Sequence, residues 1–333
     1  MFCPESGPID NTVSAIIPCY NRRVQLRDCL RSLLRLSWQP DEIIVVDDGS
    51  SDGASQMIRS EFPTIILIRN EKNLGAAASR NRAVEIAKGS WLWFLDSDVI
   101  VENPHCLQGM RVILKACENI GALGGEYSHY GKEMLYCRKY VFPNGETISR
   151  RIPKEQYRML ECDYVPTNNC IVKKSLLVNL GGFDPVYRVS SEDCELGYKI
   201  KQARMRNVVD YRTAVFHNLD VERRPSDLMK AIINRVRFVF KNFTMREIIC
   251  LPYYEISYIF RSGQINNVMR KDYQAVKHLP QGLRQMVEQG GELRIFGLIA
   301  ISMLYLFYLV TAYIYNLLML PWTLYSRSKQ GYL

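Results

Sequence analysis

Two aspartates spaced i, i+2 stand directly after a short apolar run. The run is Trp91–Leu95, and Asp96-Ser97-Asp98 follow it before apolar residues resume. Carboxylates at this spacing can hold a divalent cation or take part in acid-base chemistry. They could also do no more than end a buried strand, because Asp is common in turns. The elements around them decide between these interpretations.

Apolar, β-rich runs alternate with helical patterns along the N-terminal part of the chain. Apolar strands that alternate with helices predict an α/β fold with a parallel sheet covered on both faces. We expect strands at 13–18, 42–48, 64–68, 91–95, 122–127, 164–172 and 207–216, and helices at 25–36, 55–60, 76–87 and 107–117. A further helix is expected to begin at Ser190-Ser191-Glu192-Asp193, because Ser and acidic residues favour a helix N-terminus.

Polar clusters follow each of the first four expected strands. They are Pro18-Cys19-Tyr20-Asn21, Asp47-Asp48-Gly49-Ser50, Arg69-Asn70 and Asp96-Ser97-Asp98. The carboxyl ends of parallel strands meet at one edge of a sheet, which is where ligands bind in such folds. The pattern therefore favours one shared site over several unrelated turns.

The chain carries 43 Lys+Arg against 34 Asp+Glu, a formal net charge of +9. This excess indicates an anionic partner such as nucleic acid, lipid headgroups or a phosphorylated substrate. We expect membrane lipids and no nucleic acid, because basic residues cluster in 226–246 and no nucleic-acid-binding motif is present. The ten cysteines form no CxxC pair, and the N-terminus resembles no signal peptide, so we expect a reducing, cytoplasmic side.

The C-terminal part contains no charged residue from Ile295 to Ser326. A membrane span needs about 20 apolar residues, so we expect one transmembrane helix in 293–326, although a buried core helix is the alternative. Four regions are then expected: a catalytic domain at 1–220, basic amphipathic membrane-proximal helices at 221–292, the span at 293–326 and a polar tail at 327–333. Flanking charges do not fix the orientation.

Six motifs in order carry a resemblance to a known family. SAIIPCYNR, EIIVVDDGSSDGA, NLGAAASRNRAVEIAKG, FLDSDV, GGFDP and SEDCELGYKI, between Val13 and His217, resemble family 2 glycosyltransferases with the GT-A fold. The resemblance implies a nucleotide-sugar-binding mixed sheet flanked by helices. It also implies inverting, metal-dependent sugar transfer, with Mn²⁺ or Mg²⁺, from a nucleotide-diphosphate sugar, a UDP-sugar above all. A lipid-linked or glycan acceptor is expected, given the membrane segment.

The resemblance assigns the donor side of the site. Asp98 would bind the metal, and Asp96 would contact the ribose or the metal. The nucleobase and ribose fall to Pro18-Cys19-Tyr20 and Asp48, with Asp47 beside them. Arg80 would pair with the nucleotide or its phosphates, unless it lies on a solvated helix face.

The acceptor side is assigned in the same way. Asp193 resembles the family's general base and Glu192 supports it, although both acids could simply stabilise a helix N-terminus. His217 could give a further metal or phosphate contact, or be structural. Asn168 and Asn169 lie where such enzymes contact the donor sugar.

Two other functions remain open from the sequence. A non-catalytic protein could bind a nucleotide-sugar or dock at a membrane, and FLDSDV also resembles the first motif of haloacid dehalogenase-like phosphatases. The second is disfavoured, because that motif follows the first strand in those enzymes and no later acidic pair matches theirs. No QxxRW-like motif is present, which favours a single transfer over processive synthesis.

Overall fold

The computed structural model describes residues 12–130, 133–188, 190–217, 225–251, 253–255, 306–307 and 309–319. The chain divides into two compact units. The first comprises Met1–Tyr140, Ile148–Arg188 and Glu192–Leu219, and the second comprises Val141–Thr147, Val189–Ser191 and Asp220–Leu333. Each unit is described by itself.

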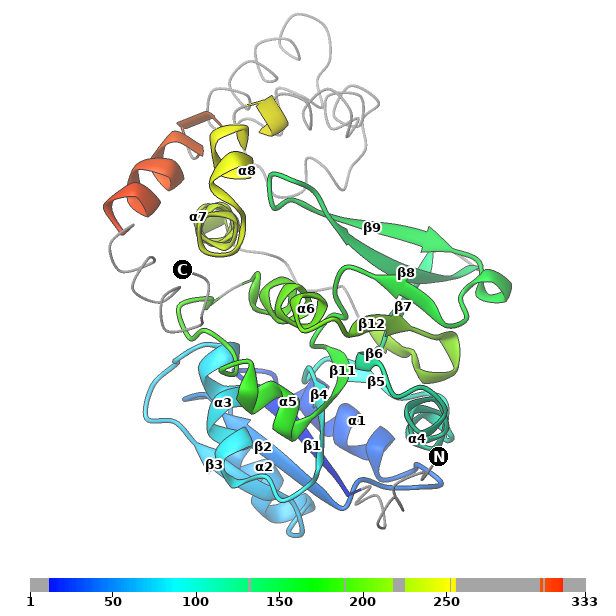
Figure 1. Cartoon of the computed structure of the whole chain (residues 1–333). Helices are drawn as coiled ribbons and strands as arrows, with labels where there is room; N and C mark the ends of the chain where they lie inside the picture. Colours follow the sequence, from blue (N-terminus) through cyan, green and yellow to red (C-terminus); the bar gives the residue numbers. More distant parts are fainter. Residues whose placement is uncertain are drawn as a thin grey trace, which may run out of the picture. The chain divides into compact units, whose positions relative to one another are not determined.

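The first unit is built on an eight-stranded mixed sheet of order β10-β12-β6-β11-β4-β1-β2-β3 (Figure 1). Its strands are β1 Val13–Cys19, β2 Glu42–Asp47, β3 Ile66–Arg69, β4 Trp91–Leu95, β6 Ile120–Gly124, β10 Leu160–Cys162, β11 Asn169–Lys173 and β12 Arg206–Val209. The first four are parallel as expected, whereas β11 runs antiparallel to both β4 and β6. The expected α/β mixed sheet is confirmed.

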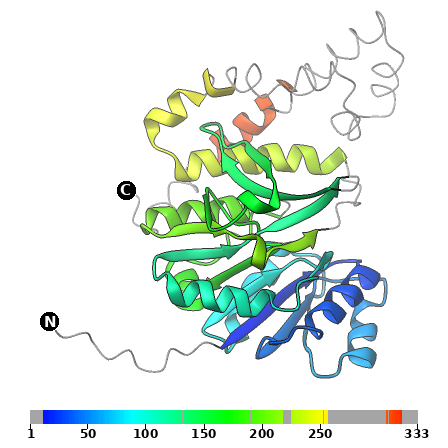
Figure 2. The same ribbon diagram turned by 90° about the vertical axis from the view of Figure 1, so that its right-hand side faces the viewer.

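Helices cover both faces of this sheet (Figures 1 and 2). The helices are α1 Arg23–Leu33, α2 Ala54–Glu61, α3 Ala76–Ile86, α4 Cys106–Ala116, α5 Lys174–Asn179 and α6 Glu192–Gln202. Successive strand residues point to opposite faces, so Ala15 and Ile17 join the core under α1, α2 and α4, while Ile16 joins the core under α3, α5 and α6. The near-continuous apolar runs in the sequence reflect this burial on both faces.

A second sheet of five strands has the order β5-β13-β7-β8-β9. It contains β5 Val99–Ile100, β7 Glu126–Tyr130, β8 Glu133–Val141, β9 Thr147–Ile152 and β13 Val215–His217, and the 3-10 turns of the fold are η1 Lys154–Gln156 and η2 Tyr211–Thr213. The single strands expected at 122–127 and 207–216 are wrong. Each divides where the chain passes from the first sheet to the second, at Gly125 (φ 132°) and at η2. The strand expected at 164–172 is shorter and begins at Asn169.

The second unit contains α7 Pro225–Asn242 and α8 Met245–Ile249. The expectation that the basic residues of this region face lipid is wrong for Arg235, Arg237 and Lys241, which are buried. Arg235 pairs with Glu255 at 2.5 Å within the unit, so its charge is used in a buried ion pair. Lys230 and Arg246 are exposed.

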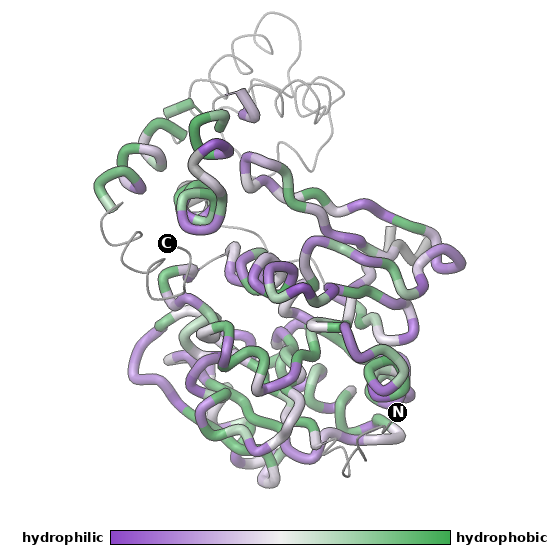
Figure 3. Tube along the Cα trace, viewed as in Figure 1, coloured by the Kyte–Doolittle hydropathy of each residue, from purple (hydrophilic) through white to green (hydrophobic). Residues whose placement is uncertain are grey.

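Most of the expected span at 293–326, most of 221–292 beyond α8, and the tail at 327–333 lie outside the described residues. Residues 306–307 and 309–318 are helical. Apolar side chains there are exposed, including Phe307 (62%), Ile314 (54%) and Leu318 (76%), and the segment is largely hydrophobic in Figure 3. Among the described residues, no helix combines the length and the apolar character needed to cross a membrane.

Candidate active site

Three of the expected site residues converge at the carboxyl end of β4. Asp96 and Asp98 occupy the turn between β4 and β5, and β13 pairs antiparallel with β5 so that His217 stands opposite Val99. One ligand atom from each of Asp96, Asp98 and His217 lies within 4.8 Å of the other two. Strand pairing therefore joins a histidine near the end of the first unit to the aspartate pair.

The donor set of this cluster suits a divalent cation. Oδ1 of Asp98 is buried and has no hydrogen-bond partner within the described structure, and Nε2 of His217 lies 3.7 Å from it. Two carboxylates with one imidazole fit Mn²⁺, and the carboxylates fit Mg²⁺, with substrate phosphate oxygens completing the shell. Asp96, Asp98 and His217 could thus hold the metal that the sequence implies.

Charge at the cluster is balanced by neighbouring cations. Burial raises the pKa of Asp98, but His217 and Arg22 outweigh it and hold that pKa below its ordinary value. Arg22, in the turn before α1, forms an ion pair with Oδ2 of Asp98. Burial lowers the pKa of His217, but the carboxylates of Asp98 and Glu126 raise it to about 10, so a cation that binds Nε2 has to displace a proton from it. The aspartate is therefore ionised and able to bind a cation.

A third acid, Glu126, lies behind His217 and was not expected from the sequence. Its Oε2 is 2.9 Å from Nδ1 of His217 and also accepts from Nδ2 of Asn168, while Oε1 pairs with Lys139. Glu126 is 7% exposed. Asn168, expected at the donor sugar, instead lies in this buried group. The only sequence signal for Glu126 is an acid directly after the Gly124-Gly125 pair.

Arg80 links Asp96 to Glu192, the neighbour of the predicted base Asp193. Its guanidinium is 1% exposed and donates to Asp96 at 2.7 Å and to Glu192 at 3.0 Å. Asp96 and Glu192 raise the pKa of Arg80 against the lowering effect of burial. The alternative of a solvated helix face is wrong. Arg80 holds two acids of the site in place, and a contact to nucleotide stays a prediction.

Asp193 lies in the first turn of α6, beside Glu192. Burial, followed by the charge of Glu192, raises the pKa of Asp193 to about 7. Its Oδ1 accepts from the backbone N–H of Cys194 at 2.8 Å, so the acid does interact with the helix N-terminus. A carboxylate with a pKa near neutrality also suits a general base.

The residues expected at the nucleobase surround the end of β1. Tyr20 is exposed (45%) and its ring is open to stacking, whereas Cys19 is buried, which raises the pKa of its thiol to about 12. Asp48 is 3% exposed and accepts from Asn70, Leu74 N–H and Gly75 N–H at 2.6–2.9 Å. Asp48 thus fixes the loop before α3, and Pro18 lies half-buried at the same strand end.

Two further residues, Asp47 at the end of β2 and Asn169 at the start of β11, have structural roles. Asp47 is fully buried and accepts from Ser50 N–H at 2.8 Å and from Arg69 at 2.6 Å. Asn169 is also fully buried, and its amide bonds to Trp93 and to two backbone carbonyls, those of Gly125 and Thr213. A donor-sugar contact by Asn169 is therefore ruled out, because the side chain is inaccessible.

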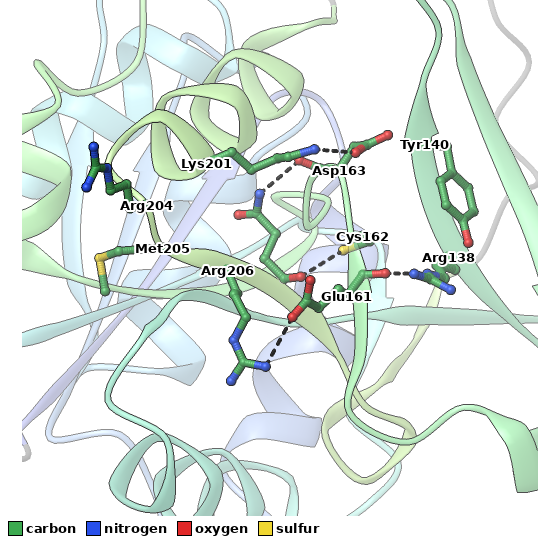
Figure 4. A pocket seen from close by; sticks show the side chains of 10 residues that line it. Arg138, Tyr140, Glu161, Cys162, Asp163, Lys201, Arg204, Met205 and Arg206 are labelled. Carbon is green, nitrogen blue, oxygen red and sulfur yellow. Dashed lines mark hydrogen bonds and ion pairs between the residues drawn. The ribbon is translucent and has the colours of Figure 1, made fainter.

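A hollow of about 310 Å³ lies on the first unit and contains none of the expected site residues (Figure 4). Its lining includes Lys201 paired with Asp163 at 2.6 Å and Arg206 paired with Glu161 at 3.1 Å. Four cations line the hollow against two acids, and Arg138 and Arg204 have no carboxylate partner among its lining residues. The hollow offers no metal-ligating cluster comparable to the one at Asp98.

Curated relatives share the N-terminal part of the chain. An uncharacterized glycosyltransferase of Haemophilus influenzae is 39% identical over 191 residues, covering 57% of this chain and 62% of that protein. Glycosyltransferase GlyA of Streptococcus pneumoniae is 31% identical over 130 residues, 38% of this chain and 18% of that one. The chain thus spans less than two thirds of either relative.

Solved structures share the fold at low sequence identity. Mannosyltransferase PcManGT from Pyrobaculum calidifontis, in complex with GDP-Man and Mn²⁺, has a TM-score of 0.54 at 17% identity, covering 92% of this chain and 86% of that one. S. aureus TarS 1-349 in complex with UDP-GlcNAc has a TM-score of 0.54 at 18% identity, covering 86% of this chain and 89% of that one. These likenesses establish the fold.

The family match rests on the same residues that form the strand-end clusters. Residues 14–178 match the model of Glycosyl transferase family 2. This range runs from β1 through β4 and the Asp96–Asp98 turn to α5. The chain therefore carries a glycosyl transferase family 2 domain.

Proposed function

We propose that the protein is a metal-dependent, inverting glycosyltransferase that moves a sugar from a nucleotide-diphosphate sugar to an acceptor hydroxyl. The observation that carries the proposal is the continuous chain of contacts from the Asp96, Asp98 and His217 cluster through Arg80 to Glu192, next to Asp193. These contacts connect the candidate metal ligands with the candidate base, which supports a single site. The solved structures with GDP-Man and UDP-GlcNAc support a nucleotide-sugar donor.

The residues divide the work of the transfer. Asp96, Asp98 and His217 would hold Mn²⁺ or Mg²⁺, which supplies positive charge to the departing diphosphate. Tyr20 and Asp48 would hold the nucleoside, and a UDP-sugar is the expected donor. Arg80 pairs with both Asp96 and Glu192, so it would keep a fixed distance between the candidate metal ligands and the candidate base.

Asp193 would act on the acceptor. Its carboxylate takes the proton of the acceptor hydroxyl as that oxygen attacks the anomeric carbon and the bond to the diphosphate breaks. One direct displacement of this kind inverts the anomeric configuration. The pKa of Asp193, raised to about 7 by burial and by Glu192, suits proton uptake near neutral pH.

We also propose a lipid-linked or glycan acceptor at the cytoplasmic face of a membrane. The exposed apolar side chains of residues 306–318 and the exposed cations Lys230 and Arg246 support contact with anionic lipid. Flotation of the protein with phosphatidylglycerol vesicles, and much less with phosphatidylcholine vesicles, is expected. If the protein stays equally in the lipid-free fraction with both kinds of vesicle, the proposed contact with anionic lipid is contradicted.

The transfer proposal is tested by screening nucleotide-sugars for release of the nucleoside diphosphate. We expect one donor to be turned over with Mn²⁺ and not with EDTA, and Asp98→Ala to abolish that release. Asp163→Ala, in the hollow of Figure 4, is the matched control and should keep wild-type activity. Equal turnover in EDTA, or by Asp98→Ala, would contradict metal-dependent transfer.

A further inference from the structure

His217 lies between two carboxylates that approach opposite nitrogens of its ring. Oε2 of Glu126 is 2.9 Å from Nδ1, and Oδ1 of Asp98 is 3.7 Å from Nε2. The two contacts differ in kind. The Glu126 contact has hydrogen-bond length, whereas the Asp98 oxygen has no hydrogen-bond partner within the described structure. Nε2 therefore points to the space that the aspartate pair would share with a cation.

The proton on Nδ1 is fixed by what surrounds that nitrogen. Nδ2 of Asn168 lies 3.0 Å from Nδ1, and Asn168 also donates to Glu126. An ionised carboxylate can only accept hydrogen bonds, and an unprotonated Nδ1 would face Oε2 of Glu126 lone pair to lone pair at 2.9 Å. We therefore assign the proton to Nδ1, which donates to Glu126, while Asn168 donates to the same oxygen.

Lys139 offsets the cost of burying the charged carboxylate of Glu126. Glu126 is 7% exposed, and Lys139 on β8 pairs with its other oxygen, Oε1, and also donates to Ser149 at 2.8 Å. A buried charge without a partner is strongly destabilising. Because Lys139 pairs with Oε1, the other oxygen, Oε2, remains to accept from Asn168 and from the imidazole.

We infer that Glu126, held by Lys139, is a positioning residue that orients His217 with its Nε2 lone pair toward the metal held by Asp96 and Asp98. The inference rests on the proposed metal-dependent function and adds a partner behind the histidine to it. Carboxylates that accept from the far nitrogen of a ligating histidine fix its tautomer and strengthen it as a ligand. Glu126 itself does not contact the metal or the substrate.

The inference is tested by titrating the full chain with Mn²⁺ alone and measuring water-proton relaxation, a readout independent of turnover. Glu126→Ala should weaken Mn²⁺ binding about 10–100-fold, the usual effect of losing such a partner. Glu126→Gln keeps an acceptor oxygen and should lose less. Glu102→Gln, which removes a carboxylate that accepts from the neighbouring Tyr127, is the matched control and should bind as the wild type does.

A double-mutant cycle separates positioning from a merely structural role. In a His217→Ala background, Glu126→Ala should cause no further loss of Mn²⁺ affinity, because its effect passes through the ring. If Glu126→Ala does not fold, Glu126→Gln takes its place in the cycle. If the losses of Mn²⁺ affinity in the two single variants add up in the double variant, or if Glu126→Ala binds Mn²⁺ as the wild type does, the positioning role of Glu126 is overturned. The proposed metal-dependent function would still stand. Failure of the wild type to bind Mn²⁺ would overturn the metal site as well.

Discussion

Arg80 and Glu192, 112 positions apart in the chain, form an ion pair of 3.0 Å that joins α3 to the first turn of α6. The same guanidinium donates to Asp96 at 2.7 Å. One buried cation therefore sets the spacing between the Asp96–Asp98 turn and the helix that carries the predicted base. Its loss should affect catalysis and stability together.

Arg80→Ala should lower the free energy of unfolding by about 3–5 kcal/mol, the cost of leaving buried charges unpaired. Arg80→Lys keeps the charge but cannot donate to both acids in fixed geometry, so we expect a smaller loss of stability with a large fall in kcat. Arg82→Lys, on the same helix, is the control for both measurements. Wild-type kcat in Arg80→Lys would show that the bridge is dispensable.

Arg22→Ala should tighten Mn²⁺ binding. The Arg22 guanidinium is paired with Asp98, and a cation entering between Asp98 and His217 has to compete with it. Removing the guanidinium removes that competition. Donor turnover should nevertheless fall if the Arg22 guanidinium binds the diphosphate of the donor in the wild type. Relaxation titration with Mn²⁺ measures the effect, with Arg23→Ala as control. Weaker Mn²⁺ binding by Arg22→Ala would contradict the competition.

Donor turnover should rise with pH through about 7, where the pKa of Asp193 lies. Only the ionised carboxylate can take a proton, so activity should fall tenfold for each pH unit below that pKa. A pH profile of kcat/KM measures this. A profile flat from pH 5 to pH 8 would exclude Asp193 as the base.

Asp193→Asn should abolish transfer and stabilise the fold at neutral pH and above. Because the pKa of Asp193 is raised from 3.8 to about 7, the folded chain binds a proton more tightly than the unfolded chain. The wild type therefore loses stability as pH rises from about 4 to about 7, and the variant does not. Its Tm should exceed that of the wild type at pH 8, and the difference should shrink toward pH 4.

The sequence predicted the part of the fold that local pattern specifies. Strands buried on both faces are continuous apolar runs, so β1 to β4 and the polar clusters after them could be located. The sequence predicts one strand where the structure has two, β6 with β7 and β12 with β13. The chain changes direction at Gly125 and at η2, but its apolar character continues there.

Motifs in the sequence locate some of the candidate site residues, and only tertiary structure brings the others beside them. Asp96, Asp98 and Asp193 stand in recognisable motifs. Glu126 meets His217 from 91 positions away, and Lys139 reaches Glu126 from a different strand, so no local spacing could reveal either. Burial of Arg80 was likewise invisible, since charged residues on helices are usually exposed.

A single displacement with Asp193 as the base inverts the anomeric configuration of the transferred sugar, so the configuration of the product distinguishes this mechanism from retaining transfer. Time-resolved proton NMR of donor turnover in Mg²⁺ should show the first-formed sugar with the configuration opposite to that of the donor. Asp193→Asn should form no such product while still binding Mg²⁺. A first-formed product that retains the donor configuration, or one formed equally fast by Asp193→Asn, would contradict the account.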